Sequence, residues 1–176
     1  MATELEVLLE KCSAGDRSAQ EQLYKRYYGK MMATCMRYLG NRDDAQDVLN
    51  AGFLKVFLNL KKFDRSGSFD GWVYSIVRNC IIDHIRSKVK YREMEGGTLD
   101  DLDFSVSEST ASKLEAKDLM NMLNILPETS RLVFNMFAIE GFKHEEIAKI
   151  LGISTGTTKW HVSESRRILK NKIENP

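Results

Sequence analysis

The side chains best suited to a chemical role lie between His144 and Leu169, where cations gather on one face of a predicted helix pair. Glu145 and Glu146 favour the start of a short helix, because acids stabilise a helix N-terminus. Gly152 supplies a tight turn, and Ser154 can cap a second helix. The inward face of this second helix is predicted to hold Thr158, Val162, Ser165 and Leu169. The outward face is then expected to hold Lys159, Trp160, His161, Ser163, Glu164, Arg166 and Arg167.

This arrangement is typical of a helix-turn-helix, whose second helix enters the major groove of DNA. Residues 159–172 hold five Lys or Arg side chains against the single acid Glu164, a balance suited to DNA phosphates. The alternative is an ordinary pair of helices whose charged face is only solvated. The pattern favours DNA binding over that alternative.

A second mixture of rings and cations runs from Phe69 to Arg92. Aromatic rings stack on unpaired bases while cations hold the backbone, so this segment suits single-stranded DNA. The alternative is that Trp72 belongs to a core and the charges are solvated, and this segment alone does not decide between the two. Two nucleic-acid signatures in one chain favour the first interpretation. The residues concerned are Trp72, Tyr74, Arg78, Asn79, Asp83, His84, Arg86, Lys88, Lys90 and Arg92.

Other polar clusters predict no catalytic group, no metal and no cofactor. The three histidines fit no metal spacing with the cysteines, so surface or capping roles are expected for them. Asp43, Asp44 and Asp47 lie at a predicted helix start, where capping explains them better than a carboxylate site. The chain shows no nucleophile triad and no phosphate-binding glycine loop.

Hydrophobic spacing predicts the helices that position these residues. A short helix is expected around Leu5 to Cys12, and three long ones follow before residue 92. Residues 63–68 have the composition of a loop. The longest stripe recurs every four residues and comprises Leu23, Tyr27, Met31, Cys35 and Leu39.

Composition changes after residue 91, where serine, glycine and acidic residues replace apolar ones. Helical spacing resumes near Leu114, Pro127 ends one helix and opens another, and Gly141 is a plausible stop. The predicted fold class is therefore all-α, with two small helical domains joined by a flexible acidic linker. The domains are expected at 1–92 and 113–176, with the linker at 93–112 and the helix-turn-helix in the second domain.

Overall composition limits the classes of protein. The 176 residues are 43% hydrophobic, and 26 basic side chains nearly balance 25 acidic ones. No apolar run approaches the roughly 18 residues of a membrane span, and the N-terminus lacks a signal-peptide pattern. A cytoplasmic protein without membrane insertion is expected. Cys12, Cys35 and Cys80 are odd in number and lie among apolar neighbours, which predicts reduced core thiols.

These motifs, in this order, resemble the extracytoplasmic-function sigma factors of the bacterial sigma-70 family. The helix at 44–57 resembles their polymerase-binding helix, in Asp44-Ala45-Gln46-Asp47-Val48 and Phe53-Leu54-Lys55-Val56-Phe57. A second segment resembles their promoter-melting helix, in Gly71-Trp72-Val73, Arg78-Asn79 and Asp83-His84-Ile85-Arg86. Their −35-binding domain is resembled by Leu126-Pro127, Arg131-Leu132-Val133-Phe134, Glu140-Gly141, Glu146-Ile147-Ala148, Leu151-Gly152-Ile153-Ser154 and Gly156-Thr157.

The resemblance implies a sigma factor that binds core RNA polymerase and directs promoter recognition, melting and transcription initiation, without being an enzyme itself. An anti-sigma factor is a further implied partner. The polymerase contacts implied are Asp44, Asp47, Asn50 and Lys55. Single-stranded −10 DNA would meet Trp72, Tyr74, Arg78, Asn79, Asp83 and Arg86. Duplex −35 DNA would meet Thr157, Lys159, Trp160, His161, Ser163, Arg166 and Arg167.

The sequence departs from this family at four positions. Ala51 stands where an acid is usual, and Lys143 where a Ser or Thr cap is usual. Trp160 replaces a frequent Ser, and Glu164 a frequent Arg. Two other classes are less well supported: a regulator of the response-regulator type needs an alternating βα receiver, and a helical enzyme or metal protein needs converging ligands.

Overall fold

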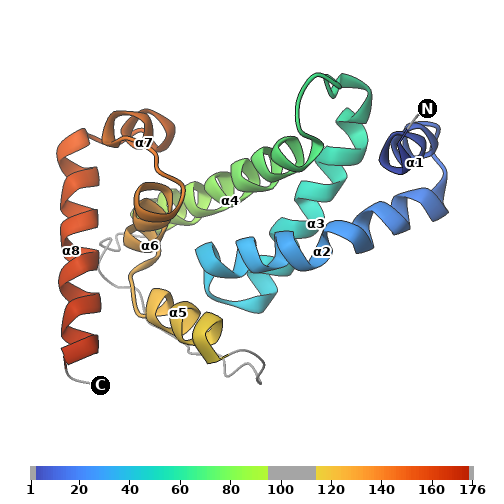
Figure 1. The fold of residues 1–176 in the computed structure, drawn as a ribbon. Coiled ribbons are helices and arrows are strands. Elements are labelled where there is room, and N and C mark those ends of the chain that lie inside the picture. The colour runs from blue at the N-terminus through green and yellow to red at the C-terminus, as the bar shows by residue number, and fades with distance from the viewer. Residues whose placement is uncertain (1–2, 95–113, 175–176) are drawn as a thin grey trace. The chain divides into compact units, whose positions relative to one another are not determined.

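The computed structural model describes residues 3–94 and 114–174, and every regular element in these ranges is helical (Figure 1). This confirms the predicted all-α fold class. The first range holds α1 (Glu4–Ser13), α2 (Arg17–Leu39), α3 (Arg42–Asn59), the short η1 (Leu60–Lys62) and α4 (Phe69–Met94). The second holds α5 (Leu114–Asn124), α6 (Glu128–Phe134), the π-helical η2 (Asn135–Ile139), α7 (His144–Leu151) and α8 (Thr155–Glu174).

Contacts divide the chain into two compact units. The first comprises residues 1–35 and 43–81, and the second comprises residues 36–42 and 82–176, so α2 and α4 each contribute to both. Of the predicted linker, residues 93 and 94 belong to α4, and the rest lies outside the described residues. The domain boundaries expected at 92 and 113 therefore stay predictions.

The first unit is held together by apolar stripes on α2, α3 and α4. The four-residue stripe predicted on α2 is buried, as helical periodicity requires when one face packs on neighbours. The two later helices each bury a matching face. The buried members are Leu23, Tyr27, Met31 and Cys35 on α2, Val48, Leu49, Phe53 and Val56 on α3, and Phe69, Val73, Val77 and Ile81 on α4.

The three cysteines are part of these cores. Cys12, Cys35 and Cys80 are all free thiols and all buried. Burial raises the pKa of the Cys35 thiol to about 12, so the thiolate form is suppressed at neutral pH. The prediction that these residues are small core side chains is confirmed.

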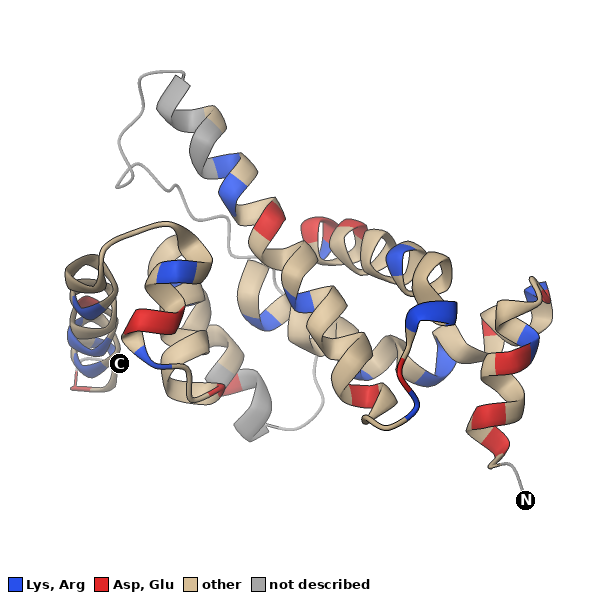
Figure 2. Ribbon diagram, turned by 90° about the horizontal axis from the view of Figure 1, so that it is seen from above, with Lys and Arg blue, Asp and Glu red and all other residues tan. Residues whose placement is uncertain are grey.

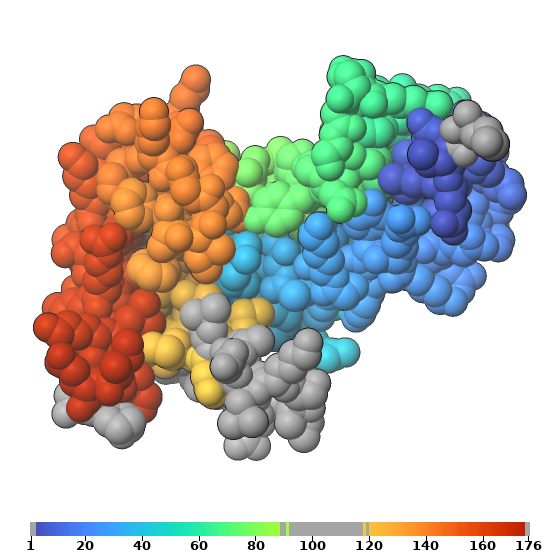
Figure 3. All heavy atoms as spheres, viewed as in Figure 1, coloured from blue at the N-terminus to red at the C-terminus, as the bar shows by residue number. Residues whose placement is uncertain are grey.

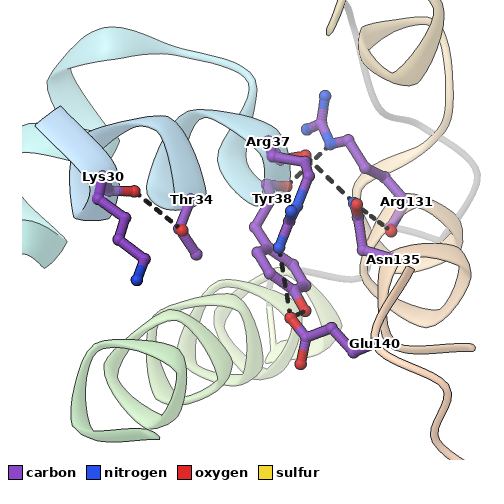
Figure 4. A network of polar contacts seen from close by, with 7 residues as sticks. All are labelled: Lys30, Thr34, Arg37, Tyr38, Arg131, Asn135 and Glu140. Carbon is purple, nitrogen blue, oxygen red and sulfur yellow. Dashed lines mark hydrogen bonds and ion pairs between the residues drawn. The ribbon is translucent and has the colours of Figure 1, made fainter. Parts of the chain in front are cut away.

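Within the second unit, side chains from α6 and η2 complete the end of α2 (Figure 4). The last carbonyls of a helix have no partner inside the helix. Arg131 donates from Nε to the Tyr38 carbonyl and from Nη2 to the Leu39 carbonyl, each at 2.9 Å. Gly40 has a φ of 78°, and a Cβ there would lie 2.3 Å from Nη1 of Arg131. Glycine is therefore required at this helix end for both conformation and space.

Of the three acids predicted at a helix start, Asp43 and Asp44 lie at the start of α3, whereas Asp47 lies too far along the helix to cap it. Asp43 and Asp44 lie in its first turn, where the helix dipole favours negative charge. Asp47 lies one turn further on and is exposed.

Two glycines in helix interiors provide a matched test of this packing. A Cβ on Gly52 of α3 would lie 3.0 Å from Cγ2 of Val77 on α4, whereas a Cβ on Gly29 of α2 meets nothing within 4 Å. We expect Gly52→Ala to lower the free energy of unfolding by about 1–3 kcal/mol through overpacking. Gly29→Ala should raise it by about 0.5–1 kcal/mol through helix propensity. Urea unfolding of both variants checks this, and equal stabilisation by both would contradict the close α3–α4 packing.

Candidate nucleic-acid interface

Two helices joined by a glycine turn form the candidate interface of the second unit. At the end of α7, Gly152 has a φ of 70°, a left-handed conformation that glycine adopts without steric cost. Its amide donates to the Ala148 carbonyl at 2.8 Å. Ser154 caps α8, because its Oγ accepts a hydrogen bond from the Thr157 amide at 2.9 Å. The predicted turn and cap are confirmed.

The start of α7 lacks a side-chain cap, as the departure at Lys143 suggests. The Lys143 side chain makes no capping hydrogen bond. The Glu146 carboxylate instead accepts a hydrogen bond from the Lys143 amide at 2.8 Å. This reciprocal half of a capping box still satisfies one free amide at the helix start.

A buried polar seam fixes the rotation of α8 about its axis; we define it as Thr158, His161 and Ser165 of α8 with Ser130 of α6. The Ser130 hydroxyl lies 2.9 Å from Nδ1 of His161, and Ser165 donates to the His161 carbonyl at 2.7 Å. Val162 is buried on the same face. Side chains fill the space that the ribbons leave between α6, α7 and α8 (Figures 1 and 3). The inward positions predicted at Thr158, Val162 and Ser165 are confirmed.

The outward orientation predicted for His161 is wrong, and so is its expected surface or capping role. Its side chain is only 8% exposed. Residues 158, 161, 162 and 165 have the i, i+3, i+4 and i+7 spacing of one helical face. A histidine can occupy that face here because Ser130 supplies a hydrogen-bond partner, and no periodicity in the sequence reveals that partner.

His144 lies beside the same helix pair. Its ring stacks on Phe137 with centroids 4.4 Å apart, and its Nδ1 lies 3.1 Å from Oγ1 of Thr158. The imidazole thus ties the first turn of α7 to α8.

The remaining predicted −35 contacts face solvent. Lys159, Trp160, Ser163, Arg166 and Arg167 are exposed, and Thr157 is half-buried. Lys and Arg recur along α8 (Figure 2). We call the exposed side of α8 that carries Lys159, Trp160, Ser163, Arg166 and Arg167 the basic face. The polar seam takes up the buried side of the same helix.

Two arginines of the basic face have partners within the protein. Arg167 donates a hydrogen bond from Nε to the Glu164 carboxylate at 2.8 Å. Hydrogen bonding between the two side chains lowers the pKa of the Glu164 carboxyl and raises the pKa of Arg167. The Arg166 guanidinium lies over the Phe137 ring, 5.8 Å from its centroid. Glu164, one of the departures from the family pattern, thus partly neutralises the basic face.

The predicted −10 residues divide between two sides of α4. Trp72, Asn79, Asp83 and Arg86 are spaced by seven, four and three residues, which places them on one helical face. Asn79, Asp83 and Arg86 are exposed. Tyr74 and Arg78 are half-buried and lie four residues apart on another side of the helix.

Trp72 belongs to an aromatic cluster rather than standing alone. Its ring centroid lies 5.3 Å from that of Phe63 and 5.7 Å from that of Phe69. The side chain is half-buried, so one part packs and another remains accessible. Trp72 thus packs partly in a core, as one interpretation of the sequence expects, and keeps an accessible part that the base-stacking interpretation requires.

On α3, the predicted polymerase contacts are mostly exposed. Asp47, Asn50 and Lys55 are exposed, and Asp44 is half-buried. Asn50 is also held internally, because its Oδ1 accepts hydrogen bonds from Tyr24 at 2.9 Å and from Gln46 at 3.1 Å.

The polymerase contacts predicted from the sequence do not include the exposed apolar side chains of α3. Leu54 is 59% exposed and Leu58 is 73% exposed. With Asp47 and Ala51 they form the α3 stripe, spaced four, three and four residues apart on one face. Their spacing along the helix could have revealed these two leucines, because it places them outside the buried face that contains Val48 and Val56.

Two kinds of feature are absent from residues 3–94 and 114–174. No helix there combines the length and hydropathy needed to cross a membrane. No three His, Cys, Asp or Glu side chains come together there in a group able to hold a metal ion.

Comparison with known proteins relates both units to one family. Residues 23–91 match the family described as Sigma-70 region 2, and residues 116–169 match Sigma-70, region 4. The ECF RNA polymerase sigma-E factor of Haemophilus influenzae is 27% identical over 96% of this chain and 95% of its own length. The ECF RNA polymerase sigma factor SigW of Bacillus subtilis is 27% identical over 95% of each chain.

A solved structure supports the fold. The sigma factor RpoE of Bartonella quintana, in complex with the anti-sigma factor NepR, has a TM-score of 0.51 at 20% identity, covering 88% of this chain and 96% of that one. The chain belongs to the sigma-70 family and, within it, to the extracytoplasmic-function sigma factors. It accordingly binds core RNA polymerase and directs promoter-specific transcription initiation.

The Glu164–Arg167 pair generates a prediction about duplex DNA. Glu164→Gln should release Arg167 and remove an acid from the basic face, so duplex affinity should rise and its salt dependence steepen by about one unit. Fluorescence anisotropy at several salt concentrations measures both quantities. Glu21→Gln is the matched control, because Glu21 forms an exposed ion pair with Lys25 on α2. Unchanged or weaker binding by Glu164→Gln would contradict the inhibitory role of this carboxylate.

Proposed function

We propose that the basic face of α8 contacts the duplex −35 element. The observation that carries this proposal is the division of α8 into a buried polar seam and a solvent-facing side rich in cations. A helix of this kind, behind a glycine turn, can insert its outward face into a major groove. Lys159, Arg166 and Arg167 would meet phosphates or bases, with Thr157, Trp160 and Ser163 beside them. His161 would support the face from beneath.

The exposed face of α4 is proposed to hold the opened −10 strand. Asn79, Asp83 and Arg86 offer polar groups to unpaired bases and to the backbone, and the accessible part of Trp72 offers a ring for stacking. Tyr74 and Arg78 lie on another side of the helix, so they would contribute by positioning α4 or by reaching the flanking backbone.

Core polymerase is proposed to bind the α3 stripe together with its polar neighbours. Asp44, Asp47, Asn50 and Lys55 would supply polar contacts, while Leu54 and Leu58 would supply apolar area. Leu54 and Leu58 lie one turn apart and are mostly exposed, so their burial in a complex would be favourable.

Further parts of the proposal rest on the family. RpoE of Bartonella quintana is solved with an anti-sigma factor, and we propose that this chain also has an anti-sigma partner. Catalysis would belong to polymerase, so the chain would act as a regulatory DNA-binding subunit in the cytoplasm without being an enzyme.

Separate variants test the two DNA contacts in the reconstituted holoenzyme. Lys159→Ala should weaken binding to a duplex −35 fragment and reduce its salt slope by about one unit, while sparing a single-stranded −10 oligonucleotide. Asn79→Ala should do the reverse, at a cost of roughly 1–3 kcal/mol in single-strand binding. Lys25→Ala, an exposed cation on α2, is the control. Equal losses of both DNA types by both variants would contradict the assignment of the two helices.

A third variant tests the polymerase contact. Leu58→Glu should weaken binding to core polymerase at least tenfold, because a buried leucine contributes about 1.5–3 kcal/mol. Circular dichroism should show unchanged helicity, since the side chain is exposed. Val7→Glu changes another exposed apolar residue, on α1, and should leave polymerase affinity unchanged. Normal holoenzyme formation by Leu58→Glu would remove the α3 stripe from the interface.

A further inference from the structure

One aromatic side chain stands among the polar ones of the basic face. Gly156, Trp160, Ser163 and Arg167 are spaced four, three and four residues apart, which aligns them along one side of α8. Trp160 is 54% exposed. Removing so large a ring from water is favourable, so its exposure on a proposed binding surface points to a ligand that covers it.

The ring of Trp160 rests on a fixed support. It meets the His161 ring edge-on, with centroids 4.9 Å apart and planes at 71°. His161 is itself buried and hydrogen-bonded to Ser130. A ring braced in this way loses less side-chain freedom on binding than an unsupported one.

Space beside the ring is kept open at Gly156. Its φ is not left-handed, and a Cβ there would meet only Oγ of Ser154 at 3.4 Å, an ordinary contact distance. The fold therefore does not require glycine at this position. Glycine also disfavours the helix relative to alanine, so helix stability does not explain its presence. A missing side chain one turn before Trp160 lets a flat partner approach the helix closely.

The surroundings of Trp160 favour a nucleic acid over an apolar protein surface. Lys159 and Ser163 lie beside it, and Arg166, Arg167 and Lys170 follow along α8. Ile173, the other large apolar side chain exposed on α8, is 13 residues away, about 20 Å along the axis. A single ring among cations does not form the contiguous apolar patch that protein partners usually bury.

We propose that Trp160 determines promoter specificity by contacting the C5-methyl group of a thymine in the −35 duplex. Within the major groove, this methyl is the apolar group that distinguishes one base pair from the others. The inference rests on the proposed −35 role of α8. It makes Trp160 a specificity residue that favours an A·T pair at one position.

The test uses holoenzyme formed from core polymerase and the full chain. The preferred −35 sequence is first selected from a randomised duplex, and each thymine in it is then replaced by deoxyuridine, which lacks only the methyl group. At one position we expect wild-type holoenzyme to lose about fourfold in affinity, the effect of burying one methyl. Trp160→Ala should bind both versions equally. Trp160→Phe should retain part of the discrimination, and Ile173→Ala should retain all of it.

The outcomes separate this inference from the function on which it rests. If wild type selects no sequence upstream of the melted region, the −35 role of α8 itself fails. If wild type selects a sequence but every uracil replacement affects wild type and Trp160→Ala alike, the thymine contact is overturned while the −35 role stands. Loss of core polymerase binding by Trp160→Ala would also overturn the inference, because the ring would then serve a protein interface.

Discussion

The hydrogen bond between Ser130 and Nδ1 of His161 sets the orientation on which the proposed −35 surface depends. A buried imidazole without a partner would cost roughly 1–3 kcal/mol, so α8 is stable in the rotation that brings His161 to α6. Thr158, Val162 and Ser165 follow His161 inward because they share its helical face. The opposite side then carries Trp160, Ser163 and Arg167. This interior contact thus helps to fix which side chains α8 exposes for the proposed contact with duplex DNA.

In the first unit, buried apolar contacts fix the rotation of each helix about its axis, as the buried polar contacts do for α8. Burial of Val48, Phe53 and Val56 leaves Asp47, Ala51, Leu54 and Leu58 on the exposed side of α3. The close approach of α3 to α4 at Gly52 holds that rotation. On α4, burial of Val73 and Val77 leaves Asn79 accessible. Each proposed binding surface is therefore the face that its helix does not use for packing.

Periodicity in the sequence predicted the helices, the buried stripe on α2, the Gly152 turn and the Ser154 cap, because each depends on local chemistry. It could not orient His161, since Ser130 lies 31 residues away and only the folded chain brings the two together. It also could not reveal that Arg131 completes the end of α2, a contact across more than 90 residues. The predicted polymerase contacts on α3 are all polar, so Leu54 and Leu58 are absent from them, although the spacing of these leucines places them outside the buried face.

The function of this chain is to give core RNA polymerase the ability to start transcription at particular promoters. Run-off transcription of genomic DNA, followed by mapping of the RNA 5′ ends, tests it directly. With core polymerase and the purified chain, we expect a discrete set of start sites that share two short sequence elements at a fixed spacing. Core polymerase alone should not produce that set. Start sites that are identical with and without the chain, or that share no upstream elements, would show that the chain does not confer promoter specificity.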